Sequence, residues 1–523
     1  MDGISQRLVA GLVIAGFVCC SVAAADTDPK ADLMARAEAL EQQLAAMRAQ
    51  DTSEAVLAMQ AEETRTVVRE MATDAAEHAE FDIVWRNGVW IVSGDRFAAH
   101  VGGRVYADWG WVNADALKHN DGARFQVPYV GVVNLYNEHT SIRDGSEFRT
   151  VRLLAEGTLY KYIQYKVELG WDGETVMLYD AWMQMIDVPF IGNIQVGHFK
   201  EPFSLEEQTD SLFGTFMERS LGNVLSPGRN PGLMIHDAIL GEEGKERLSW
   251  AIGVFRMEEV GQIFNTPLQG TNITSDGGYA LSMRVTALPW YADNGEKLLH
   301  LGFAYSVRTP PHDTRFGVGE MVRYAAKPEA HWLQFHVLDT GWIAGAPIDA
   351  FTGAVDNVNS FGAELAVVYG PFSVQMEYVG VKLDTDTVRR PFAFNPDRYL
   401  SPFQENPCFN AFYVEASYFI TGEHREYDHE RGAFKRVTPK KNFREDGGWG
   451  AVQVATRYSY VDLDAEYANG LNSHGECSNW TMGVNWHLNP NVRLMANYIR
   501  SCPDRLDTAN ALDIFMMRFQ WDF

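Results

Sequence analysis

Sixteen charged side chains stand at alternate positions of segments in which apolar and polar residues also alternate. Guanidinium groups bind oxyanions, and charged groups along a water-filled wall select ions by sign. With each apolar face turned outward, the inner wall carries eight bases: Arg104, Arg152, Lys166, Arg284, Arg308, Arg457, Arg493 and Arg518. It also carries eight acids: Asp108, Glu156, Glu168, Asp180, Glu364, Glu377, Glu415 and Asp522. The equal numbers favour pairs that brace neighbouring strands, and ion guidance is the alternative role of these charges.

A second charged group lies in the stretch 197–221, GHFKEPFSLEEQTDSLFGTFMERSL. This stretch is too charged for a core and too aromatic for a linker. Pro202 ends the preceding alternation, because proline cannot donate a ladder hydrogen bond. The candidate residues of this segment are Lys200, Glu201, Glu206, Glu207, Glu218 and Arg219, and they are net acidic.

Other chemistry has weaker support in the sequence. His424 and His429 flank Tyr427-Asp428, but the surrounding composition favours a solvated loop over an acid–base or metal cluster. No C-x-x-C spacing accompanies the lone His474, so a zinc site is not predicted. The sequence predicts no catalytic residue, no metal and no cofactor.

Three cysteines remain after the first 25 residues, namely Cys408, Cys477 and Cys502. Disulfides form in exported proteins. Cys477 and Cys502 flank neighbouring predicted strands, so we expect these two to pair if any two do.

The elements that must position the charged residues are β-strands, because a period of two places alternate side chains on one face. We expect sixteen strands: 97–111, 148–157, 160–171, 175–186, 191–200, 233–241, 248–256, 278–288, 297–308, 361–370, 372–382, 409–420, 449–461, 479–488, 491–500 and 512–523. An even number suits an antiparallel transmembrane barrel, since lipid cannot satisfy an open sheet edge. Soluble β-sandwiches also alternate. The greasy face of Trp480, Met482, Val484 and Trp486 favours the barrel.

The connections alternate in length, as they do in membrane barrels. The connections 187–190, 370–371 and 489–490 are short and are assigned to the periplasmic side. The connections 112–147, 201–232, 309–360 and 383–408 are long and are assigned to the exterior. The connection 421–448 is long but falls on the periplasmic side, which conflicts with this rule.

The N-terminal part differs from the strands in composition. Residues 1–25 have a basic residue, an apolar run and an Ala-rich end, which is typical of a signal peptide. Residues 26–80 are rich in Ala, Glu and Gln, and predict an α-helical, coiled-coil-like periplasmic segment; a single amphipathic helix is the alternative. Residues 81–96 form a linker to the barrel domain, 97–523.

The overall charge narrows the possible partners. The net charge of −25 and the lack of a basic stripe disfavour nucleic acid. The mature chain has no run of about 18 apolar residues, so a helical membrane protein is not expected. Outer-membrane lipid is the partner that the alternating strands predict.

Five segments resemble the phosphate-selective porins O and P: 148–169, 196–221, 364–379, 414–439 and 483–498. The resemblance implies a homotrimer of sixteen-stranded barrels in the outer membrane. It also implies passage of small inorganic anions or other small solutes, with a preference for phosphate or polyphosphate in some members. The terminal Phe523 resembles the closing residue of such barrels. By analogy with general porins, the third exterior loop, 201–232, folds into the barrel as a constriction.

The functional hypothesis is therefore a porin with a water-filled channel. Two other classes stay open. One is an envelope-anchoring barrel with little conductance, and the other is an outer-membrane barrel enzyme.

Overall fold

The computed structural model describes residues 81–85, 88–94, 96–113, 143–172, 175–257, 276–312, 322–333, 336–340, 343, 355–385, 406–464, 475–504 and 511–523. The chain divides into two compact units, Met1–Asp82 with Val92–Gly94, and Ile83–Ile91 with Asp95–Phe523. The predicted signal peptide and helical segment, residues 1–80, lie outside the described residues. The second unit contains the barrel.

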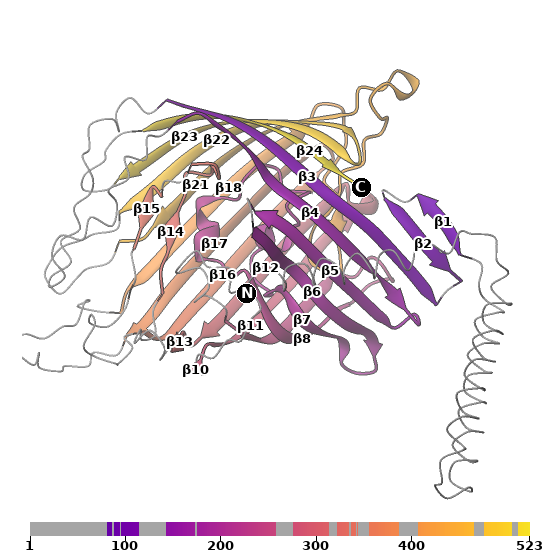
Figure 1. The fold of residues 1–523 in the computed structure, drawn as a ribbon, viewed down its shortest axis with the longest axis horizontal. Helices are drawn as coiled ribbons and strands as arrows, with labels where there is room; N and C mark the ends of the chain where they lie inside the picture. The colour runs from indigo at the N-terminus through magenta and orange to yellow at the C-terminus, as the bar shows by residue number, and fades with distance from the viewer. Residues whose placement is uncertain are drawn as a thin grey trace, which may run out of the picture. The chain divides into compact units, whose positions relative to one another are not determined.

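Sixteen antiparallel strands form one closed barrel, as the alternation predicts (Figure 1). They are β3 (Phe97–Asn113), β4 (Gly145–Leu159), β5 (Ile163–Asp172), β6 (Thr175–Val188), β7 (Gly192–Lys200), β8 (Arg229–Ile239), β9 (Leu248–Arg256), β11 (Tyr279–Ala292), β12 (Lys297–Arg308), β16 (Val355–Tyr369), β17 (Phe372–Thr385), β18 (Cys408–Phe419), β21 (Ala451–Asp462), β22 (Glu476–Asn489), β23 (Val492–Asp504) and β24 (Leu512–Asp522). Each strand pairs with the next, and β24 pairs with β3 to close the sheet, with Phe519 opposite Ala107. Every predicted strand is present, and the β-sandwich alternative is wrong.

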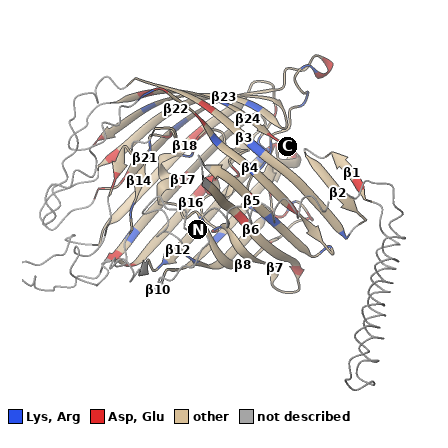
Figure 2. Ribbon diagram, viewed as in Figure 1, with Lys and Arg blue, Asp and Glu red and all other residues tan. Residues whose placement is uncertain are grey.

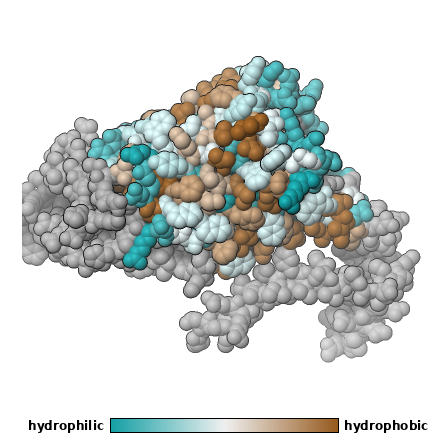
Figure 3. Space-filling view, turned by 90° about the horizontal axis from the view of Figure 1, so that it is seen from above, coloured by the Kyte–Doolittle hydropathy of each residue, from teal (hydrophilic) through white to brown (hydrophobic). Residues whose placement is uncertain are grey.

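The exposed and buried faces of the strands are reversed relative to a soluble protein. On β22, Trp480 is 54% exposed and Met482 60%, whereas Asn479 and Asn485 are fully buried. An outer face of large apolar side chains fits contact with hydrocarbon. Figure 3 shows apolar residues gathered over the middle of the visible face. Among the described residues, no helix has both the length and the apolar composition needed to cross a membrane.

Short elements lie between and before the barrel strands. β1 (Asp82–Trp85) and β2 (Val89–Ser93) lie in the range assigned to a linker, and they pair with each other. The remaining elements are β10 (Asp276–Gly277), β13 (Pro311–His312), β14 (Ala325–Ala326), β15 (Leu338–Asp339), β19 (Tyr427–Asp428), β20 (Ala433–Phe434), the helix α4 (Leu205–Gln208) and the 3₁₀ turns η2 (Leu221–Leu225), η4 (Asp293–Gly295) and η5 (Glu445–Gly447).

Three connections fold into the barrel, because their side chains contact inward-facing residues of distant strands. We call them the inward segments: residues 201–228, the described residues between 322 and 343, and residues 421–448. In the first, Thr215 Oγ1 donates to Glu415 of β18 at 2.9 Å. In the second, Glu329 accepts a 2.6 Å hydrogen bond from Arg457 of β21. In the third, the carbonyl of Gly432 accepts a 2.8 Å hydrogen bond from Arg284 of β11.

The third inward segment resolves the conflict in connection length. It joins β18 to β21 at the end of the barrel that carries the short turns, so the strand count is correct. It is long because it turns back into the barrel. The solvated loop expected around His429 is wrong, since His429 Nδ1 lies 2.8 Å from the carbonyl of Glu246 and its ring packs edge-on against Tyr291.

Part of the barrel interior is an apolar core. Inward positions of the last strands, including Leu383, Ile499 and Ile514, pack with Phe203 and Leu338 from the first two inward segments. The inward face was expected to be charged, and on these strand ends it is apolar. Burial of this cluster from water stabilises the inward segments.

The expected pairing of Cys477 with Cys502 is wrong, because all three described cysteines are free. Ser478, not Cys477, lies opposite Cys502. A one-residue offset places the two thiols on opposite faces of the sheet. Cys477 is buried on the inner face beside Ser501, with 3.5 Å between sulfur and hydroxyl oxygen.

The tip of the third inward segment depends on a close approach at Gly432. Its φ is +58°, and a Cβ there would lie 2.5 Å from Thr286 Oγ1. We expect Gly432→Ala to cost about 1–3 kcal/mol through overpacking and to release the tip. Trypsin would then cleave after the buried Arg425 ~10-fold faster or more.

Gly447→Ala is the matched control for this change. Gly447 also has a positive φ, +73°, but no atom lies within 4 Å of a Cβ built there. Equal cleavage of the two variants would mean that backbone strain alone, and not the contact with Thr286, holds the tip.

Candidate functional site

The candidate site is the charged inner wall together with the inward segments. All eight predicted bases lie on the barrel wall, and basic and acidic residues are interspersed along the strands (Figure 2). Seven of the eight contact a carboxylate: Arg104 and Arg152 with Glu168, Lys166 with Glu168 and Asp180, Arg284 with Glu364, Arg308 with Glu201, Arg457 with Glu206 and Glu329, and Arg518 with Asp108 and Glu218. Most of the wall's charge is therefore neutralised in place.

Glu168 on β5 is the centre of one such cluster. Arg104, Arg152 and Lys166 approach its carboxylate at 3.2, 3.2 and 3.3 Å. Arg152 also lies over the ring of Tyr179, 3.3 Å from the centroid. Three bases around one buried acid form a network that fixes strands β3 to β5 against each other.

The remaining predicted acids are also paired. Glu156 contacts His100 at 3.2 Å, and Asp522 contacts Arg436. Glu415 accepts from Arg425 at 3.2 Å. Glu377 accepts hydrogen bonds from the backbone N–H groups of Leu205 and Glu206, at 2.8 and 2.7 Å, at the start of α4.

The carboxylates of the first inward segment are occupied by bases. Glu201 contacts Arg308 at 3.0 Å, Glu206 contacts Arg457 at 3.1 Å, and Glu207 contacts Arg219 at 2.6 Å. Glu218 contacts Arg149 at 2.9 Å and Arg518 at 2.7 Å. The ammonium of Lys200 donates to the backbone carbonyl of Glu207. The net acidity of this segment is thus balanced by arginines, most of them from the wall.

Local sequence explains how this segment begins. Pro202 follows Glu201 at the end of β7, and Ser204 then caps α4 by accepting a 3.1 Å hydrogen bond from the N–H of Glu207. Acids in the first turn of a helix interact favourably with its N-terminal dipole. The capped turn thus presents its N–H groups to Glu377 and the carboxylate of Glu206 to Arg457, both on the facing wall.

Sequence reasoning missed Glu329 in the second inward segment. Its carboxylate accepts from Arg457, Ser459 and Thr481, and from the N–H of Leu221. No periodicity surrounds Glu329, so the sequence offered no signal for it.

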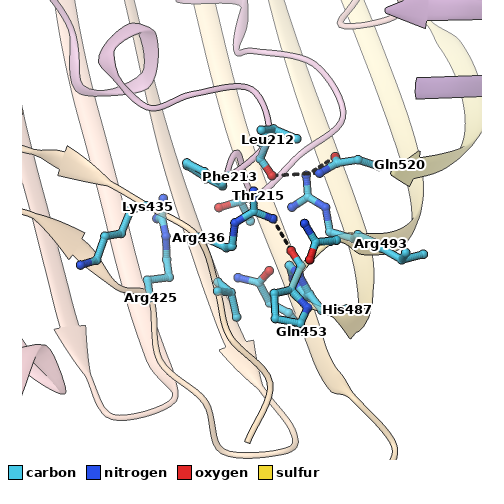
Figure 4. Close-up of a pocket in the computed structure, with 14 residues that line it drawn as sticks. Leu212, Phe213, Thr215, Arg425, Lys435, Arg436, Gln453, His487, Arg493 and Gln520 are labelled. Carbon is cyan, nitrogen blue, oxygen red and sulfur yellow. Dashed lines mark hydrogen bonds between the residues drawn. The ribbon is translucent and has the colours of Figure 1, made fainter. Parts of the chain in front are cut away.

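A small basic pocket, also missed, lies between the first and third inward segments and the wall (Figure 4). Its volume is about 20 Å³, which is space for about one water molecule. Its charged lining residues are Arg425, Lys435, Arg436 and Arg493, with His487 beside them and no acid in the lining. The run Lys435-Arg436 in an unexpectedly long connection was the available signal.

Arg493 differs from the other wall arginines. It donates to the carbonyl of Gly214 at 2.8 Å and to Gln520 at 2.7 Å, but within the described chain no carboxylate lies within ion-pair distance. Its Nε and the Nε2 of His487 have no partner there either. Buried donors without acceptors are costly. The pocket therefore offers the charge of Arg493 and its unpaired Nε–H group to a small anion.

Charge interactions keep two loop carboxyls ionised. Burial alone would raise the pKa of Asp210 and Glu218, but Arg104 beside Asp210, and Arg149 and Arg518 beside Glu218, hold both pKa values below the usual range. Burial raises the pKa of Glu206 in spite of Arg457. Among the described residues, no group of three His, Cys, Asp or Glu side chains could hold a metal ion.

Comparison with known proteins identifies a family model, curated relatives and solved structures that are similar to this chain. The family model for phosphate-selective porin O and P matches residues 122–523. Porin O of Pseudomonas aeruginosa is 24% identical over 420 residues, 77% of this chain and 87% of that protein. An uncharacterized protein of Caulobacter vibrioides is 26% identical over 432 residues, 80% of this chain and 71% of that protein. An anion-selective porin from Comamonas acidovorans aligns with a TM-score of 0.46 at 12% identity, over 82% of this chain and all of that one.

The double contact of Glu218 can be tested by Glu218→Gln. Removal of this half-buried charge leaves Arg149 and Arg518 less neutralised. We expect the reversal potential in a salt gradient across a planar bilayer to shift toward anions. Glu445→Gln removes the same charge from an exposed residue that accepts a hydrogen bond from Asn442, and should leave the potential unchanged. Identical shifts in the two variants would contradict a local role for Glu218.

The lowered pKa values of Asp210 and Glu218 predict a pH dependence. A carboxyl with a lower pKa in the folded state stabilises above its unfolded pKa of about 4, and this stabilisation is lost as pH falls through the folded pKa. Amide hydrogen exchange at 210–218, corrected for the intrinsic pH effect, should stay constant from pH 7 to about 4 and rise below it. Asp210→Asn should flatten the rise. A rise that begins between pH 7 and 5 would contradict the assignment.

Proposed function

Because the chain belongs to the phosphate-selective porin O and P family, we propose that the channel it forms in the outer membrane conducts small anions in preference to cations. The channel and its outer-membrane location follow from the family. The sign of its selectivity, the residues responsible and the physiological solute are the proposed part. Members of this family are porins and not enzymes.

Arg493 carries the proposal for anions. The charges of the other seven wall bases are balanced by nearby carboxylates, so each pair exerts little net electrostatic force on an ion that is further away than the pair's own separation. Arg493 contacts only a carbonyl and an amide oxygen in the described chain, and Arg425, Lys435 and Arg436 line the same pocket. Arg425, Lys435 and Arg436 contact Glu415, Glu426 and Asp522, so the uncompensated charge at this point is that of Arg493, and it lowers the energy of a passing anion.

The size of the pocket limits the solutes that it holds without rearrangement. A volume of about 20 Å³ accepts a species near the size of one water molecule. Chloride suits this volume better than phosphate. Phosphate would require displacement of long side chains such as that of Arg436, which pairs with Asp522.

The N-terminal region and the assembly complete the proposal. We place a signal peptide at 1–25, a periplasmic helical segment at 26–80, a linker at 81–96 and the barrel domain at 97–523. The subunits form a homotrimer, in which three helical segments associate. The wall bases and the acids of the 201–228 segment are the proposed pore-lining and constriction residues.

A second candidate function is an envelope-anchoring barrel with little conductance. Three inward segments and an apolar core occupy the interior, which favours a narrow or closed path. This candidate predicts no channel openings in a planar bilayer. Any clear single-channel conductance from the purified protein removes it.

Arg493→Gln tests the anion preference. One unit charge acting on an ion 4 Å away in water contributes about 1 kcal/mol, favourable for an anion and unfavourable for a cation, so the anion-to-cation permeability ratio should fall by a factor of about 30. The measurement is the reversal potential in a potassium chloride gradient.

Arg500→Gln is the control from the same strand. Arg500 lies seven residues further along β23 on the opposite, outer face, where it pairs with Asp513 at 3.0 Å. Its removal should leave the permeability ratio unchanged. An unchanged ratio in Arg493→Gln, or cation preference in the wild type, would refute the proposal.

A further inference from the structure

We propose that the hairpin of β1 and β2 is a membrane-contacting element whose outer face lies in the lipid headgroup boundary beside the seam of β24 and β3. The occupant of this face is the lipid surface of the leaflet at the short-turn end of the barrel. The inference concerns the membrane surface, and does not depend on the ion preference of the channel.

The hairpin stands beside β3 where β24 does not pair with it. β24 pairs with β3 from Asn113 to Arg104, and Phe523 then exchanges two 3.0 Å backbone hydrogen bonds with Gly103. β2 is also a partner of β3. The ring of Trp90 in β2 stacks on His100 of β3, with centroids 4.9 Å apart and planes 13° apart.

A close contact fixes the height of the hairpin on the barrel. A Cβ at Gly88 would lie 2.3 Å from His100 Nε2 and 3.2 Å from the carbonyl carbon of Phe523, and φ at Gly88 is +154°. Only glycine therefore fits at this point. The contact holds the turn of the hairpin at the level of His100, four residues along β3 from Arg96. Arg96 marks the short-turn rim, because its carbonyl accepts a hydrogen bond from the N–H of Tyr160.

The outer face of the hairpin is apolar and exposed. Trp90 and His100 lie on the inner side, because His100 is buried and shares the inward face of β3 with Arg104. In β1, Ile83 is 75% exposed and Trp85 66% exposed, while Val84 between them is less exposed. Val89 at the start of β2 is exposed as well. This face continues the outer face of β3, where Val101 is exposed.

Two constraints together set the depth of the hairpin in the membrane. Apolar side chains above the rim formed by Tyr160 are driven out of water into the acyl region. In the part of the chain that the structure describes, β2 covers one edge of β1, and hydrocarbon could not satisfy the backbone groups of the other edge. The headgroup boundary meets both constraints, and tryptophan is enriched there. A short strand of four residues limits the cost of the remaining edge.

Site-directed spin labelling tests the depth directly. The full-length protein, with its other cysteines replaced by serine, carries one label at Ile83→Cys or at Val84→Cys and is reconstituted in phosphatidylethanolamine–phosphatidylglycerol vesicles. Collisions of the label with oxygen and with a water-soluble nickel chelate are measured. Labels at Phe303→Cys, on the outer barrel face, and at Glu445→Cys, in an exposed turn, set the lipid and water limits.

We expect the oxygen-to-nickel ratio at Ile83→Cys to be severalfold higher than at Val84→Cys and at Glu445→Cys, and to lie below that of Phe303→Cys, because the headgroup boundary admits more of the water-soluble chelate than the acyl region does. Val89→Cys provides a second position on the same face if Ile83→Cys does not fold. A ratio like that of Glu445→Cys would overturn the proposal, because the face would then lie in water. Low collision rates with both reagents, with dipolar broadening between labels, would also overturn it in favour of a second copy of the chain.

Discussion

Closure of the sheet by β24 on β3 is the constraint from which the rest of the structure follows. A membrane offers no partner for an unpaired strand edge, so sixteen strands must form a ring. Once the ring is closed, one set of alternate side chains on each strand faces lipid and the other set faces the barrel interior. Large apolar side chains such as Trp480 then stay outside, and most of the charged residues of the strands are confined to one enclosed volume.

Because the charged side chains of the strands face the barrel interior, most of them form ion pairs there. Arginines buried in the wall need compensation, and the nearest carboxylates are on neighbouring strands or on segments that can fold inward. Arg518 combines both solutions, since it pairs with Asp108 of β3 and with Glu218 of the first inward segment. Wall charge in this barrel therefore acts first as an attachment for the segments that narrow it. Our proposal assigns selectivity to the groups that remain uncompensated, with Arg493 as the clearest case.

The strands could be predicted from sequence because alternation repeats the same simple signal sixteen times, and each segment needs only its own residues to show it. The acidic 201–228 segment was recognisable from Pro202 and its mixed composition. The partners of Glu329, the inward course of 421–448 and the opposite facing of Cys477 and Cys502 were not predictable. Each of these depends on which distant strands the barrel brings together or on the register between two strands. A local sequence pattern predicts neither the neighbouring strand nor the register.

One arginine gives the interior a further property. Arg457 donates at once to Glu206 of the first inward segment and to Glu329 of the second, at 3.1 and 2.6 Å. Two loops distant in sequence thus share one cation, and neither can leave the wall without changing the electrostatic balance of the other. Their opening free energies are not independent, so substitutions in the two loops will be non-additive. The first and second inward segments therefore form one cooperative unit, in which a substitution that destabilises one segment also destabilises the other.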